Sequence, residues 1–280
     1  MDPRLVTILN QAAAPPGRIM VLTGAGISAD SGLPTFRGQD GFWTVGSRVY
    51  RPEEIGTRPF FDEHPGTSWA WYLWRRNLAR RAEPNEAHRA LAELQETMGE
   101  RMVLVTQNVD GLHRRAGHET AGLYEVHGNP DEMRCSAPCS SDRYPIPQEV
   151  VGPANPEDQL TRADWDRLRC PRCDASTRPH VLWFDETYTE ELYQIETVRS
   201  LARRLDLLIT IGTSGMTNLP EWIAHAATGH GAAMIDINPE PNPLRRLAER
   251  AAHGYMIVGV AAEQVPTVLE RLIVRLGEAA

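Results

Sequence analysis

The stretch RIMVLTGAGISADSG, residues 18–32, decides the fold. An apolar run is closed by a glycine turn, which is the pattern of a buried strand that ends near Gly24. Glycine lets the backbone come close to a ligand, and amide groups at a helix start bind phosphate. The spacing differs from the GxGxxG of ordinary dinucleotide-binding folds, so the turn alone is only a weak indication of a nucleotide.

The same strand-and-turn pattern returns along the chain. It occupies residues 100–113, 206–214, 232–240 and 255–261. Helical patterns lie over 84–98, 219–229 and 242–252, a final helix fits 263–280, and a short amphipathic helix fits 5–13. This alternation predicts an α/β fold with a mostly parallel sheet that is covered by helices on both faces. Such sheets bind ligands at the carboxyl ends of their strands.

The composition narrows the function classes. The chain has 280 residues, a net charge of −8 and a pI of about 5.6, which argues against non-specific nucleic-acid binding. RRNLARR (75–81) is either a local basic patch or a solvated helix face. No apolar run reaches the ~18 residues of a membrane span, and we expect a cytoplasmic protein without a signal peptide. The sequence does not define an oligomeric state.

Every basic residue other than histidine is an arginine, and lysine is absent. A bias in the coding sequence explains this directly. The functional alternative is a protein that cannot acylate its own side-chain amines.

Two segments interrupt the alternation and predict a second, smaller lobe. Residues 40–83 are rich in aromatic residues and arginine and are expected to be helical, whereas the segment after 130 holds all four cysteines. The predicted small domain therefore comprises 40–83 and 131–186. The predicted large domain comprises 1–39, 84–130 and 187–280.

The cysteines form two close pairs. Three residues separate Cys135 from Cys139, and two separate Cys170 from Cys173. Two such pairs are typical of a zinc ribbon, in which four thiolates hold the metal tetrahedrally. A closed site of four thiolates leaves no position for a substrate, so one zinc ion would be structural. The alternative is four buried or free thiols.

Polar residues follow the second strand. Gln107, Asn108 and Asp110 cluster in TQNVDGLH (106–113), where each of them could also serve as a cap or turn residue. His127 lies between an apolar segment and a Gly-Asn-Pro turn. Its ordinary pKa near neutrality suits a general base, although a lone histidine of this kind is often a buried structural group.

Taken in order, these strings resemble the sirtuin family, the NAD-dependent protein deacylases. The resemblance rests on GAGISADSG, PTFRG, TQNVDGLH, the His127-Gly128 pair, the cysteine pairs, RPHVLWF (178–184), GTS (212–214) and IN (237–238), and covers about 18 to 262. It implies a Rossmann-like large domain and a smaller helical and zinc-binding lobe, with the active site between them.

The resemblance also implies roles for individual residues. His127 would be the general base, and Phe36 and Arg37 would lie on a mobile loop over the nicotinamide end. The residues implied to contact NAD are Gly24, Ala25, Gly26, Ser28, Asp30, Phe36, Arg37, Trp43, Gln107, Asn108, Asp110, Gly212, Thr213, Ser214, Asn238 and Ala261. In the implied reaction the acyl oxygen attacks the ribose carbon of NAD as nicotinamide leaves, and the acyl group ends on ADP-ribose.

The helical segment WAWYLWRRN (69–77) resembles the branch of the family that removes acidic acyl groups from lysine, which carries a Tyr-x-x-Arg pair. Tyr72 and Arg75 share one helix face. Arginine binds a carboxylate through two parallel hydrogen bonds, and the phenol adds a donor. A succinyl or malonyl group would supply the carboxylate. Alternatively the tryptophans pack while Arg75 and Arg76 face water.

The substrate side departs from the family pattern. Val181 and Phe184 are implied to contact the acylated lysine of a protein substrate, but Asp185 replaces the glycine of WFGE, and GTSGMTNLP (212–220) has its proline one residue late. These changes leave ADP-ribosyl transfer or NAD hydrolysis on the same scaffold as an alternative. An idle NAD-binding module is a further alternative, which His127, Asn108 and Asp110 disfavour.

Overall fold

A computed structural model describes residues 1–280 except 36–54, 138, 156–157 and 279–280. Phe36, Arg37 and Trp43 lie outside the described residues. The strands are β1 (Ile19–Thr23), β2 (Met102–Thr106), β3 (Leu123–Glu125), β4 (Gly128–Cys135), β5 (Arg143–Pro145), β6 (Thr177–Val181), β7 (Leu207–Ile211), β8 (Ala233–Ile237) and β9 (Gly254–Ile257).

The helical segments fill the intervals between these strands. They are α1 (Pro3–Ala13), the 3₁₀ turn η1 (Ala25–Ser31), α3 (Arg58–Glu63), α4 (Pro65–Arg81), α5 (Glu86–Met98), η2 (Gly99–Arg101), α6 (Leu112–Arg115), α7 (Arg162–Arg167), α8 (Glu190–Tyr193), α9 (Ile195–Ala202), α10 (Asn218–Gly229), α11 (Pro243–Arg250) and α12 (Ala261–Glu278). Among the described helices, none is long and apolar enough to cross a bilayer.

The larger sheet has six strands in the order β3-β2-β1-β7-β8-β9, all parallel. The predicted strand in each of the five sequence patterns is confirmed. Side chains alternate across this sheet, as the two-residue period of a strand requires. Ile19 and Val21 pack with α1, α5 and α12 on one face, and Met20 and Leu22 pack with α9, α10 and α11 on the other. Burial on both faces explains why the strands read as unbroken apolar runs.

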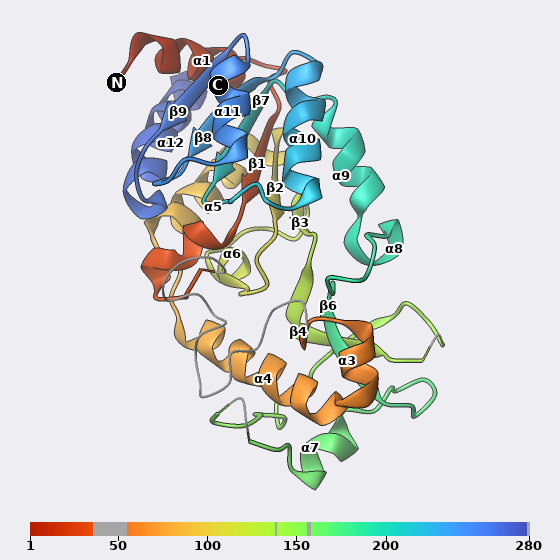
Figure 1. The fold of residues 1–280 in the computed structure, drawn as a ribbon. Coiled ribbons are helices and arrows are strands. Elements are labelled where there is room, and N and C mark those ends of the chain that lie inside the picture. The colour runs from red at the N-terminus through yellow and green to blue at the C-terminus, as the bar shows by residue number, and fades with distance from the viewer. Residues whose placement is uncertain (36–54, 138, 156–157, 279–280) are drawn as a thin grey trace.

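A second sheet of three antiparallel strands, in the order β5-β4-β6, makes the core of a smaller lobe. Its apolar cluster includes Trp69 and Leu73 of α4 together with Met133 of β4. Figure 1 shows the six-stranded sheet and its helices at the top of the view, with α3, α4, α7 and the small sheet below. The pairing of β4 with β6 has an irregular register between Gly128 and Met133.

Candidate active site

Two glycine turns meet at the carboxyl ends of β1 and β7. The amide of Gly26 donates to the Gly212 carbonyl at 2.8 Å. A Cβ on Gly26 would come within 2.7 Å of the Gly212 backbone, and Gly212 itself has a φ of +58°. No larger side chain fits between these loops without displacing backbone. The result is a tight turn whose backbone a phosphate could approach closely.

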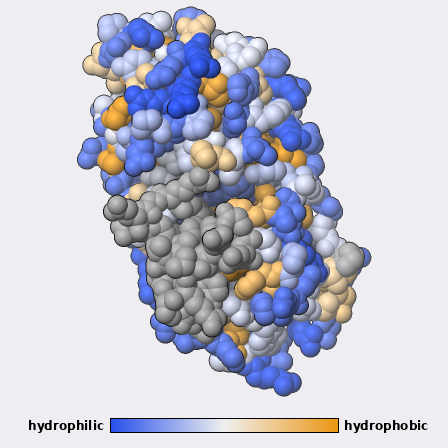
Figure 2. All heavy atoms as spheres, viewed as in Figure 1, coloured by the Kyte–Doolittle hydropathy of each residue, from blue (hydrophilic) through white to orange (hydrophobic). Residues whose placement is uncertain are grey.

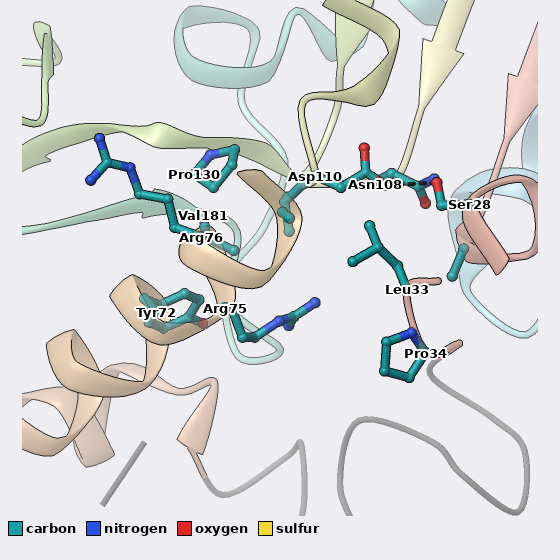
Figure 3. A pocket seen from close by; sticks show the side chains of 13 residues that line it. Ser28, Leu33, Pro34, Tyr72, Arg75, Arg76, Asn108, Asp110, Pro130 and Val181 are labelled. Carbon is teal, nitrogen blue, oxygen red and sulfur yellow. Dashed lines mark hydrogen bonds between the residues drawn. The ribbon is translucent and has the colours of Figure 1, made fainter. Parts of the chain in front are cut away.

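A polar cluster lies beside this turn. Ser28 donates to the Asp110 carboxylate at 2.7 Å, and the Asn108 amide donates to Ser28 at 3.2 Å and to the Gly24 carbonyl at 3.1 Å. Figure 3 shows the Asn108–Ser28 contact at one end of a pocket. Burial raises the pKa of Asp110, and the hydrogen bonds from Leu112 and Ser28 act against that rise. The sequence motifs around 24 and 107 are thus brought together in space.

Gln107 connects three of the loops. Its amide donates to the Thr213 hydroxyl at 2.9 Å, and its carbonyl accepts from the Thr217 hydroxyl at 3.1 Å. Asn238 donates to the Thr213 carbonyl at 2.9 Å. The turns after β1, β2, β7 and β8 therefore form one continuous edge. This edge is where a parallel sheet binds a dinucleotide.

The remaining NAD candidates lie around this edge. Ala25 lines the pocket, Ser214 is exposed, and Asp30 accepts from the Ala262 amide at 3.4 Å at the start of α12. Ala261 is buried in the core cluster of that helix. The turn after Gly24 is a 3₁₀ segment.

His127 stands between β3 and β4, next to the same edge. Its Nδ1 lies 2.8 Å from the Gln107 carbonyl, and its Nε2 lies 2.9 Å from the hydroxyl of Tyr188. Burial lowers the pKa of His127 to about 4. The imidazole is therefore neutral at physiological pH, which is the form a base requires.

The pocket joins the polar cluster to α4. It is lined by Leu33 and Pro34 on one side, Tyr72 and Arg75 on another, and Asn108 with its neighbours at the far end. In Figure 3, Arg75 reaches across the pocket toward Leu33 and Pro34, whereas Arg76 extends the opposite way. The structure thus brings the Tyr72–Arg75 pair to the same pocket as Asn108 and Asp110, the two residues expected to bind the nicotinamide carboxamide.

Tyr72 and Arg75 are both held in a low-dielectric setting. Trp183 donates its indole N–H to the Tyr72 hydroxyl at 3.0 Å, and burial raises the pKa of Tyr72 to about 12. Burial also lowers the pKa of Arg75 to about 10, although the nearby Tyr72 and Asp110 act in the opposite direction. The Arg75 guanidinium lies 4.8 Å above the Trp71 ring. It remains cationic near neutral pH.

One interpretation of the helix predicts that Arg76 faces water, and this prediction is wrong. Arg76 is 2% exposed and donates to Asp131 at 2.7 Å and to the Val150 carbonyl at 3.2 Å. Arg80, one turn later, also binds Asp131. The segment 75–81 is therefore neither a free basic patch nor a wholly solvated face.

The peptide-side residues are divided between buried and exposed. Val181 lines the pocket, while Phe184 is 59% exposed and its backbone amide donates to Gly56 at 2.8 Å. Asp185 accepts from the Arg58 amide at 3.1 Å, at the first residue of α3. Figure 2 shows an apolar area right of the centre of the view, and further single apolar residues scattered over the upper part.

The four cysteines meet in the small lobe. Their sulfur atoms all lie within 4.8 Å of one another, with Cys135 and Cys173 at 3.5 Å and Cys139 and Cys170 at 3.7 Å. A zinc–sulfur bond of about 2.3 Å gives tetrahedral edges of about 3.8 Å. The arrangement therefore fits one structural zinc ion.

Two contacts of the site were missed at the sequence level. Tyr188 touches His127, and Thr217 holds Gln107. Both residues lie in segments that depart from the family pattern, WFDETY and GTSGMTN. These departures are the feature of the sequence that could have pointed to the two contacts.

The parallel sheet has a tight glycine turn and polar side chains at the carboxyl ends of its strands, which is typical of α/β proteins that bind dinucleotides. The small lobe adds a cluster of four cysteines. The Sir2 family pattern matches residues 24–218. The chain belongs to the Sir2 family.

Its relatives are similar over most of their length. An NAD-dependent protein deacylase of Pyrococcus furiosus is 37% identical over 90% of this chain and 92% of that protein. One of Aeropyrum pernix is 40% identical over 82% and 84%. A crystal structure of a Sir2 homologue with NAD superposes with a TM-score of 0.78 at 31% identity, covering 99% of this chain and 95% of that one.

Proposed function

We propose that this chain is an NAD-dependent protein-lysine deacylase, in which His127 is the base. The observation that carries the proposal is the fixed orientation of His127. Because a carbonyl can only accept, the Gln107 contact requires the proton on Nδ1, and Nε2 keeps its lone pair. A neutral imidazole beside the polar strand ends suits removal of a proton from a sugar hydroxyl. The names of the relatives support the same activity.

The loop residues fit NAD as a co-substrate. The Gly24–Gly26 turn and the 212–214 turn would hold the phosphates, Gln107 and Asn238 the riboses, and Asn108 with Asp110 the carboxamide of nicotinamide. NAD would supply the ribose carbon to which the acyl oxygen becomes attached. The chain's own part is to orient the sugar, exclude water and move the proton. Zinc at the four cysteines would only support the small lobe.

We also propose a preference for acidic acyl groups. Arg75 offers a cation in a desolvated wall of the pocket, where a carboxylate would gain a strong charge-assisted hydrogen bond. The Tyr72 oxygen accepts from Trp183, so the phenol proton remains able to point at the same carboxylate. A neutral acetyl group has no negative charge to pair with the Arg75 cation. The acyl-lysine would enter past Val181 and Phe184.

The test is a side-by-side assay of one peptide that carries either acetyl- or succinyl-lysine. Nicotinamide and acyl-ADP-ribose are followed together. A tenfold or larger preference in kcat/KM for succinyl, about 1.4 kcal/mol, would support the carboxylate site. An equal or better acetyl reaction would make the protein a general deacetylase.

One observation favours a second candidate. Two groups of the WFDE segment already have partners, the Phe184 amide and the Asp185 carboxylate, so the segment is less open to pair with a peptide strand. ADP-ribosyl transfer or NAD hydrolysis would need no such pairing. Nicotinamide release without consumption of either peptide would identify that activity.

The organisation predicted from the sequence enters the proposal unchanged. The large domain would comprise 1–39, 84–130 and 187–280, and the small domain 40–83 and 131–186. We expect the enzyme to act in the cytoplasm on acylated proteins.

A further inference from the structure

The hydroxyl of Tyr188 lies 2.9 Å from Nε2 of His127, and the two rings stack at 6.0 Å with an interplanar angle of 27°. The proposed mechanism does not use this tyrosine. It occupies the only lone pair through which His127 can accept a proton. A proton from the substrate can therefore reach Nε2 only if Tyr188 moves away or passes the proton on.

The direction of this hydrogen bond follows from the Gln107 contact. Since Nδ1 carries the proton, Nε2 must accept, and Tyr188 must donate. Burial raises the pKa of Tyr188 to about 12 and lowers the pKa of His127 to about 4, so both groups are neutral at physiological pH. The donor and acceptor roles are thereby fixed in the resting protein.

Tyr188 is held in place from both sides along the chain. Two residues earlier, Glu186 accepts from the Trp183 amide at 3.0 Å and from Arg134 at 3.1 Å, and it also binds Arg178. One residue later, Thr189 caps α8.

The Tyr188 ring is fixed as well. It packs against the apolar cluster of α9 and α10 and lies edge-on to Tyr193, with ring centroids 6.4 Å apart. Withdrawing the phenol would disrupt this packing, so Tyr188 is placed to work where it stands.

We propose that Tyr188 is a further catalytic residue, which relays the proton between the substrate sugar hydroxyl and His127. A phenol suits this because its oxygen can accept one proton while its own proton departs. The inference rests on the proposed function, since it takes His127 as the base.

In the relayed step, the sugar oxygen forms a bond to the acyl carbon and the sugar O–H bond breaks. The double bond between that carbon and the positively charged lysine nitrogen opens, and its electron pair moves onto the nitrogen. The proton of the sugar hydroxyl passes to the Tyr188 oxygen, and the Tyr188 proton passes to Nε2, which leaves an imidazolium. The phenol is neutral before and after, and nothing is oxidised or reduced.

The experiment compares Tyr188→Phe with His127→Ala and the native protein, using succinyl- and acetyl-lysine peptides. The relay predicts that Tyr188→Phe lowers kcat roughly tenfold to hundredfold with little change in either KM. Exchange of labelled nicotinamide into NAD, which precedes the base-dependent step, should persist in both variants. Tyr193→Phe is the matched control, because it removes a neighbouring phenol that does not touch His127, and its kcat should stay near the native value.

A second readout needs neither NAD nor peptide. Loss of the phenol removes a donor to neutral His127, so the pKa of His127 should rise in Tyr188→Phe, as followed by NMR of the ring nitrogens. Native kcat in Tyr188→Phe, or an unmoved His127 titration, would overturn the relay. If His127→Ala is inactive in that case, the proposed function stands; if His127→Ala also turns over normally, both ideas are wrong.

Discussion

The two walls of the proposed active site are built in different ways; we call them the NAD wall and the acyl wall after the groups that they are proposed to bind. The NAD wall consists of strand ends, backbone amides and short polar side chains that bind one another, such as Ser28, Asn108 and Asp110. The acyl wall consists of large side chains from one helix, Tyr72 and Arg75, held by Trp183 and by their own burial. The shape of the NAD wall is determined mainly by the backbone conformation, whereas the shape of the acyl wall depends on the packing of large side chains from different elements. Changes in specificity are therefore expected on the acyl wall.

The largest expected effect comes from removing the zinc. Structural zinc sites contribute on the order of 10 kcal/mol to folding, and the four cysteines support the lobe that carries the acyl wall. Chelation, or Cys173→Ser, should disorder the β5-β4-β6 sheet and leave the six-stranded sheet protected. Hydrogen exchange followed by peptide would measure this. Equal loss of protection in both sheets would contradict separate support for the two walls.

Replacing the base should affect chemistry and not cofactor binding. His127→Ala is expected to lower deacylation by roughly a hundredfold to ten-thousandfold, because it removes the proposed general base. NAD affinity, measured by calorimetry, should stay close to that of the native protein. Native turnover in this variant would show that the base lies elsewhere.

The backbone nature of the NAD wall can be tested at one glycine. Gly26→Ala would force a Cβ to within 2.7 Å of Gly212, with an expected cost of about 1–3 kcal/mol in stability and a loss of NAD binding. Gly229→Ala is the matched control. That glycine ends α10, and an added Cβ there would meet nothing within 4 Å, so the variant should fold and bind NAD normally. Thermal melting with and without NAD would distinguish the two.

The acyl wall can be tested by one arginine. Arg75→Met keeps the helix and the bulk but removes the cation, so the ratio of succinyl to acetyl kcat/KM should fall about tenfold or more. Arg80→Met is the control on the same helix. Arg80 is exposed, binds Asp131 and does not line the pocket that contains Arg75. An unchanged ratio in Arg75→Met would mean that this wall does not select the acyl group.

The last expected effect concerns acid stability beneath the NAD wall. The rings of His88, His113 and His118 lie against one another there, one pair tilted and the other edge-on, with ring centroids 4.9 and 5.1 Å apart. Burial lowers the pKa of His118 from 6.5 to about 4. Between these pH values the unfolded chain takes up a proton that the native protein does not, so stability falls as the pH falls. Above pH 6.5 this histidine makes no difference.

His118→Gln should therefore reduce the acid dependence of the unfolding free energy by about 1 kcal/mol per pH unit between pH 6.5 and 4. The measurement is denaturant unfolding at pH 7 and pH 5. His225→Gln, at an exposed position on α10, serves as the comparison and should leave the native dependence in place. If the unfolding free energy of the two variants changes equally between pH 7 and pH 5, His118 is not a source of the acid sensitivity.

The two walls also differ in how well the sequence predicts them. The strands, their turns and the meeting of the 24 and 107 motifs follow from periodicity and from the rule that parallel strands end at one edge. The cysteine cluster follows from spacing. The burial of Arg76 and the contact of Tyr188 with His127 do not follow, because each depends on a partner from another element, Asp131 in one case and a loop after β6 in the other.

One atom of the NAD wall has a consequence for how this protein can change over evolutionary time. The oxygen that fixes the His127 tautomer is the main-chain carbonyl of Gln107, and every amino acid at that position supplies it. Mutation at 107 can therefore weaken the contacts to Thr213 and Thr217 while the base keeps its proton on Nδ1. Substitution of Gln107 is therefore expected to leave the protonation of His127 unchanged and to alter the binding of the co-substrate.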